Sequence, residues 1–103
     1  MPDWEYSAFS YESVTVGTSA TAITSFITTG GATKRGQRAF ITVEDNDIRF
    51  RYDGTDPTST EGHVASSGDQ FEISGYDDIR RFRAIRHSAA AGDAVLKISL
   101  EAF

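Results

Sequence analysis

Apolar and polar residues alternate at every second position in several short stretches of the chain. In the clearest stretch, Ile48 to Tyr52, two arginines separate three large apolar residues. Successive side chains of a β-strand point to opposite faces of the sheet. The pattern therefore predicts a strand with Ile48, Phe50 and Tyr52 in the core and with Arg49 and Arg51 on the outside.

Similar alternation marks the other expected strands. It runs through residues 39–43, 71–73 and 96–100, with weaker patterns at 14–16 and around 22–27. β-Branched and aromatic residues suit the pleated surface of a sheet, which supports these assignments. The side chains expected to face inward are Val14, Val16, Ala39, Ile41, Val43, Phe71, Ile73, Leu96, Ile98 and Leu100.

The residues between these stretches have the chemistry of turns. Asp45-Asn46-Asp47 separates two strongly alternating stretches and predicts a hairpin between them. Residues 76–80 are expected to form a helical turn before a strand that contains Phe82 and Ala84. Glycines stand at most of the other boundaries, so the strands are short and closely spaced.

Together these elements predict an all-β fold. About seven to eight short strands at this spacing favour a small antiparallel β-sandwich, immunoglobulin-like or jelly-roll-like. The chain has 103 residues, which suffices for one hydrophobic core and not for two. We expect one β-sandwich domain over residues 13–103, preceded by a distinct N-terminal segment or arm over residues 1–12.

The N-terminal segment is rich in aromatic residues, namely Trp4, Tyr6, Phe9 and Tyr11. One interpretation is an edge strand with these rings tucked under the sandwich. The other is an extended arm whose rings dock on a neighbouring subunit, because exposed aromatic patches mark contact surfaces. The sequence leaves both interpretations open.

Composition narrows the classes of function. The chain contains no cysteine, which excludes cysteine-based zinc sites and thiol nucleophiles and fits assembly in a reducing cytoplasm. A formal net charge of −5 argues against a general nucleic-acid binder, which needs a basic surface. The sequence has no signal-peptide pattern and no apolar run near the ~20 residues of a membrane helix. We expect a soluble protein that binds neither nucleic acid nor a membrane.

No pattern of residues predicts catalysis. His63 and His87 do not stand at a metal-ligand spacing, and no serine lies in a G-x-S-x-G elbow. In the loop from Asp53 to His63, Asp and Thr side chains can cap their own turns, and the acids could also hold calcium or the loop a glycan. We expect no catalytic residue, no resident metal and no cofactor, and so a protein that is not an enzyme.

Arginine is used far more often than lysine, with eight arginines and two lysines. Arginine is favoured at protein interfaces because its planar fork pairs with carboxylates and stacks on aromatic rings. The expected partners are Glu44, Glu72 and Asp77 of this chain or carboxylates of another protein. The candidate interface therefore comprises Trp4, Tyr6, Phe9, Tyr11, the outward-facing Phe40, and the arginines Arg49, Arg51, Arg81 and Arg83.

Five short segments of the sequence carry a resemblance. In chain order they are Ile41-Thr-Val-Glu, Ile48-Arg-Phe-Arg-Tyr-Asp-Gly-Thr-Asp-Pro-Thr, Glu61-Gly-His-Val, Gly68-Asp-Gln-Phe and Ile79-Arg-Arg-Phe-Arg-Ala-Ile-Arg. In this order they resemble small structural proteins of tailed bacteriophages and prophages, over residues 37–100. The phrase from Tyr52 to Thr58 also resembles the strand and loop of immunoglobulin-like domains appended to bacterial glycosidases.

The phage resemblance implies a component of the virion. The first expectation is a capsid decoration (cement) subunit, made in the host cytoplasm, that binds the major capsid protein or other virion proteins and associates with itself. A head–tail or tail accessory protein is the alternative within the same class. A carbohydrate-binding or adhesin-like module, with Trp4, Tyr6 or Tyr52 as sugar platforms, is the alternative of another class.

Overall fold

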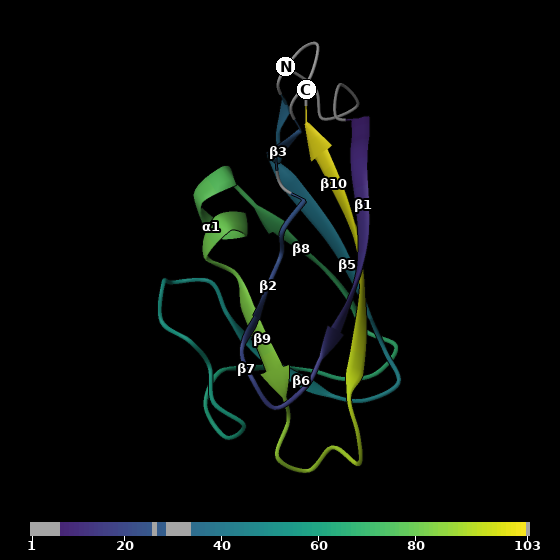
Figure 1. Ribbon diagram of the computed structural model, residues 1–103, viewed down its shortest axis with the longest axis vertical. Coiled ribbons are helices and arrows are strands. Elements are labelled where there is room, and N and C mark those ends of the chain that lie inside the picture. The colour runs from purple at the N-terminus through teal and green to yellow at the C-terminus, as the bar shows by residue number, and fades with distance from the viewer. Residues whose placement is uncertain (1–6, 26, 29–33, 103) are drawn as a thin grey trace.

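The computed structural model describes residues 7–25, 27–28 and 34–102. In these residues the chain forms short strands and one short helix (Figure 1). The elements are β1 (Ser7–Val16), β2 (Thr21–Ala22), β3 (Ile27–Thr28), β4 (Lys34–Arg35), β5 (Arg38–Glu44), β6 (Ile48–Arg51), β7 (His63–Ala65), β8 (Gln70–Ser74), α1 (Tyr76–Arg81), β9 (Arg83–Arg86) and β10 (Ala94–Ala102).

The strands build two four-stranded antiparallel sheets. Sheet A has the order β1-β10-β5-β8, and sheet B has the order β2-β9-β6-β7. The short strands β3 and β4 pair with each other as a separate ribbon. The predicted all-β fold, a small antiparallel β-sandwich, is confirmed, and the helical turn predicted at residues 76–80 corresponds to α1.

The core lies between the inner faces of the two sheets. On β10 the side chains are buried at every second position, as strict alternation requires, and β5 repeats the pattern with Ala39, Ile41 and Val43. Sheet B contributes Ile48 and Ala84, each with 0% of its surface exposed. Each aliphatic side chain the size of Ile buried in this way stabilises the fold by about 1.5–3 kcal/mol.

Three phenylalanine rings join the two sheets at one side of the core. Phe50 of sheet B stacks on Phe71 of sheet A, with ring centroids 4.6 Å apart and an angle of 9° between the planes. Phe82, which follows α1, lies 5.7 Å from Phe50 and 6.3 Å from Phe71. Aromatic pairs at such separations contribute about 0.5–1.5 kcal/mol beyond the area that they bury.

The hairpin predicted at Asp45-Asn46-Asp47 is wrong. The strand before this turn, β5, pairs with β10 and β8, whereas the strand after it, β6, pairs with β9 and β7. The turn therefore carries the chain from one sheet to the other. Asp45 adopts a φ of 76°, which allows the sharp reversal that turn chemistry predicts. The sequence shows where the chain turns but not which strand its next strand will pair with.

The N-terminal part of the described chain is an edge strand. β1 pairs with β10 from Ser7 to Val16, so the boundary expected after residue 12 falls inside a continuous strand. Phe9 packs against the core, as the edge-strand interpretation proposes, while Tyr11 is 60% exposed. Trp4 and Tyr6 lie outside the described residues.

Candidate binding surfaces

The outer face of sheet A carries two aromatic side chains in one row. The register places Tyr11 opposite Ser99, Ser99 opposite Phe40, and Phe40 opposite Glu72. Side chains of register partners lie on the same side of a sheet, so the four residues share one face. Tyr11 is 60% exposed and Phe40 is half-buried. We call this row and the sheet surface around it the Tyr11–Phe40 face.

Polar pairs flank the row on both sides. Arg38 Nε donates to Glu101 Oε1 at 2.5 Å and lies 3.5 Å from Glu72 Oε2. In the row on the other side, Lys97 Nζ donates to Ser13 Oγ at 3.0 Å. An aromatic centre with a polar rim is the composition of protein contact surfaces, where aromatic residues are enriched and charges are kept to the edge.

The outer face of sheet B is covered by the chain's own loop over residues 53–63. Arg49, which points outward from β6, donates from Nη1 to the carbonyl oxygen of Gly62 at 2.8 Å. Its Nε donates to the carbonyl oxygen of Ser59 at 3.2 Å. Pro57, in the middle of the loop, is buried. Arg49 therefore anchors the loop within the chain through backbone carbonyl oxygens, and not through the carboxylates that the sequence predicts as partners of the arginines.

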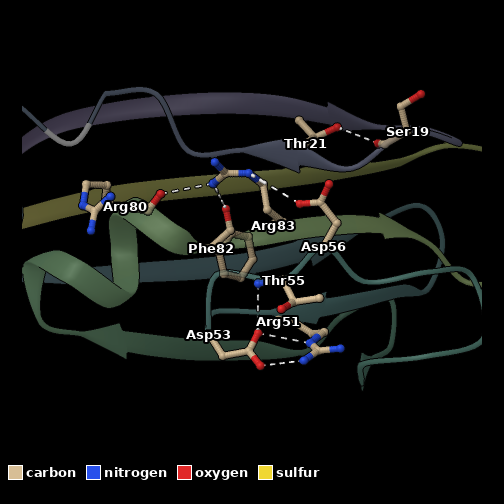
Figure 2. Close-up of polar contacts among 9 residues, drawn as sticks. All are labelled: Ser19, Thr21, Arg51, Asp53, Thr55, Asp56, Arg80, Phe82 and Arg83. Carbon is tan, nitrogen blue, oxygen red and sulfur yellow. Dashed lines mark hydrogen bonds and ion pairs between the residues drawn. The ribbon is translucent and has the colours of Figure 1, made fainter.

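Two more arginines hold the start of this loop (Figure 2). Arg51 donates two hydrogen bonds to Asp53, from Nε to Oδ1 at 3.1 Å and from Nη2 to Oδ2 at 2.5 Å. Arg83 Nη1 donates to the carbonyl oxygen of Phe82 at 2.8 Å, and its Nε lies 4.0 Å from the carboxylate of Asp56. The start of the loop thus lies beside two guanidinium groups, and Arg51 is the one that is hydrogen-bonded to a carboxylate of the loop.

The Arg51 pair shifts the protonation of Asp53. The hydrogen bonds from Arg51 are the main cause that lowers the pKa of Asp53 to about 2, and the amide of Thr55 also donates to this carboxylate. Desolvation acts in the opposite direction and is outweighed. Asp53 therefore stays ionised far into the acid range, and its carboxylate keeps a fixed place at the edge of the loop.

The loop returns to the sheet through a glycine that no other residue replaces easily. Gly62 has a φ of +134°, and a Cβ there would lie 3.1 Å from the carbonyl oxygen of Phe50 and 3.2 Å from Cβ of Pro57. Thr58 and Glu61 exchange backbone hydrogen bonds of 3.0 and 3.2 Å just before it. The loop is thus a self-bonded turn, as the ability of its Asp and Thr residues to cap their own turns predicts.

An open depression of about 600 Å³ lies between the two ends of this loop. Its lining consists of Arg51, Tyr52, Asp53, Glu61, Gly62 and His63. Tyr52 is 38% exposed, so the prediction that it belongs to the core is wrong: β6 ends at Arg51, and Tyr52 stands at the margin of the aromatic cluster. Its ring stacks on His63 at 6.1 Å and on Phe50 at 6.3 Å. We call this hollow the Tyr52 depression.

The structure divides the predicted interface residues between the two layers. Tyr11 and Phe40 come together on sheet A, and Arg49, Arg51 and Arg83 belong to sheet B. Exposed Arg81 lines a smaller hollow of about 250 Å³. Two further residues of these surfaces could not be identified from the sequence, because only strand register and loop folding reveal where they stand. They are Ser99, the small residue between the two rings, and Glu61.

The two histidines make different contacts. His63 lies against the rings of Phe50 and Tyr52, whereas His87 accepts a hydrogen bond from the amide of Ala89 at 3.0 Å. Within the described ranges, no group of three or more His, Cys, Asp or Glu side chains is placed to hold a metal ion. The same part of the chain contains no helix that is long and apolar enough to cross a membrane.

Comparison with known proteins gives no relative from which a role could be transferred. No family model, no curated protein and no solved structure matches the chain.

Proposed function

We propose that the protein is a structural subunit of a tailed-phage virion that decorates the capsid by binding the major capsid protein. Two points support this role: the resemblance of residues 37–100 to phage structural proteins and one observation on the fold. That observation is the Tyr11–Phe40 face, an aromatic row on the outside of sheet A with paired charges at its rim.

The face has the physical properties that docking requires. Phe40 stands on β5, a central strand that is hydrogen-bonded on both sides, and Tyr11 stands on the edge strand β1, which pairs with β10 along its length, so sheet A holds both rings in place. Rigid presentation lowers the entropy lost on binding. Aromatic side chains near the centre of a contact supply most of its binding free energy, and a rim of satisfied polar groups excludes water around them. The outer side of sheet B differs, because the loop over residues 53–63 already covers it.

The test uses shells assembled from the major capsid protein of a phage that encodes this chain. We expect the purified protein to sediment with the shells and to delay their rupture by heat or by chelators. Substituting Tyr11→Ala and Phe40→Ala together is expected to weaken this binding by about 30-fold or more, the loss of roughly 2 kcal/mol typical of a hot spot.

Tyr52→Ala is the matched control, because Tyr52 is also an exposed tyrosine but follows β6 of sheet B and stands outside the Tyr11–Phe40 row. This variant is expected to bind shells as the unmodified protein does. A protein that sediments with purified tails and not with shells would replace the decoration role by that of a tail accessory. A protein that sediments with neither would contradict the virion proposal altogether.

A further inference from the structure

We infer that the Tyr52 depression is a binding site for an uncharged, pyranose-containing glycan. The site differs from the proposed capsid contact, because it lies at the end of β6 in sheet B and approaches the Tyr11–Phe40 row only at Glu72, which lines a neighbouring hollow with Tyr52 and His63. With sheet A docked on a shell, sheet B and its loop form the layer away from that contact.

The size and lining of the depression fit a small ligand. Its volume of about 600 Å³ lies within the ~300–1,000 Å³ common for small-molecule sites. A pyranose ring has one apolar C–H face and a rim of hydroxyl groups. Tyr52 offers an aromatic surface for the apolar face, since π-systems carry negative charge on their faces and attract C–H groups.

Polar groups beside the Tyr52 ring can bind the hydroxyl groups at the rim of the sugar. Asp53 and Glu61 supply carboxylate oxygens, which accept short charge-assisted hydrogen bonds from hydroxyl groups. Arg51 uses Nε and Nη2 for Asp53, and no described residue accepts from its Nη1. That nitrogen can therefore donate to a sugar oxygen.

The charge of the lining selects among glycans. Two carboxylates, of Asp53 and Glu61, face one guanidinium, of Arg51, so the formal charge of these three groups is negative. Because the pKa of Asp53 is lowered to about 2, its carboxylate is ionised at neutral and mildly acidic pH. A sialylated or sulfated sugar would meet like charge there, which disfavours acidic glycans and favours neutral ones.

The walls of the site are held before any ligand arrives. The bidentate Arg51–Asp53 pair fixes one wall, and the backbone hydrogen bonds between Thr58 and Glu61 fix the other. His63 stacks against Tyr52 from β7. A site whose groups are already ordered binds with a smaller loss of conformational entropy.

The experiment presents the full chain to an array of neutral, sialylated and sulfated oligosaccharides and measures the affinity of hits by calorimetry. We expect binding to neutral glycans and little to acidic ones. Tyr52→Ala is expected to weaken binding roughly tenfold, the effect of losing one ring contact, whereas Tyr52→Phe keeps the ring and the affinity. Glu61→Gln, at a side chain with no hydrogen bond in the described structure, is expected to weaken it by a similar factor.

Tyr11→Ala serves as the control, because it removes an exposed tyrosine of the other sheet and is expected to leave glycan binding unchanged. The inference is overturned if no glycan binds, if acidic glycans bind best, or if Tyr52→Ala and Glu61→Gln bind as tightly as the unmodified protein. None of these results bears on capsid binding, which the Tyr11 and Phe40 substitutions test independently.

Discussion

Removing the ring of Phe82 is the sharpest test of how the two sheets are joined. Phe82 is 1% exposed and lies beside the stacked pair of Phe50 from sheet B and Phe71 from sheet A, with its ring 5.7 and 6.3 Å from theirs. Burial of such a ring stabilises the fold by about 2–3 kcal/mol, and each ring contact adds about 0.5–1.5 kcal/mol. We therefore expect Phe82→Ala to lower the free energy of unfolding by about 3–5 kcal/mol, the range found for core phenylalanines.

The assay is urea unfolding followed by circular dichroism, together with thermal unfolding. For a domain of this length each kcal/mol corresponds to about 4–8 °C, so the melting temperature is expected to fall by at least about 12 °C. Tyr11→Ala, at an exposed position, is expected to change stability by no more than about 0.5 kcal/mol. A loss below about 1 kcal/mol for Phe82→Ala would refute the conclusion that this ring joins the sheets.

Three further predictions concern the loop and the edge strand. Gly62→Ala should destabilise the fold by roughly 1–3 kcal/mol in urea unfolding, and more than Gly68→Ala, whose added Cβ meets no atom within 4 Å. Because the folded-state pKa of Asp53 is lowered to about 2, its contribution to stability is present above about pH 4 and lost as the pH falls through about 2. Titration by NMR should show this midpoint, and Arg51→Gln should move it up toward the usual ~3.9; an unchanged midpoint would contradict the assignment to Arg51. Glu12→Ala should speed hydrogen exchange at the amides of residues 24 and 25, which both donate to its carboxylate.

The sequence predicts the elements whose burial alternates strictly. Ile41, Leu96 and Ile98 are buried where period two places them, because the apolar face of each strand is removed from water only by packing against the other sheet. Tyr52 follows the same period and is nevertheless exposed, since the strand ends one residue earlier and the chain turns away. Alternation identifies a strand's faces but not its last residue.

The candidate sites were harder to predict, because they depend on pairing between distant strands. Tyr11 and Phe40 stand 29 positions apart in the chain, and only the shared neighbour Ser99 on β10 places them in one row. The large number of arginines indicated guanidinium groups that need hydrogen-bond acceptors, and Arg49 and Arg51 have such acceptors within the chain. The partners of Arg49 turned out to be loop carbonyl oxygens, which no charge pattern reveals.

Hydroxyl-radical footprinting of the protein on assembled capsid shells tests the central claim most directly, since it reports the solvent access of individual aromatic side chains. Binding through sheet A predicts that Tyr11 and Phe40 lose reactivity when the protein is bound, while Tyr52 remains as reactive as in the free protein. Protection of Tyr52 with Tyr11 and Phe40 unchanged would contradict the assignment of the Tyr11–Phe40 face as the capsid contact.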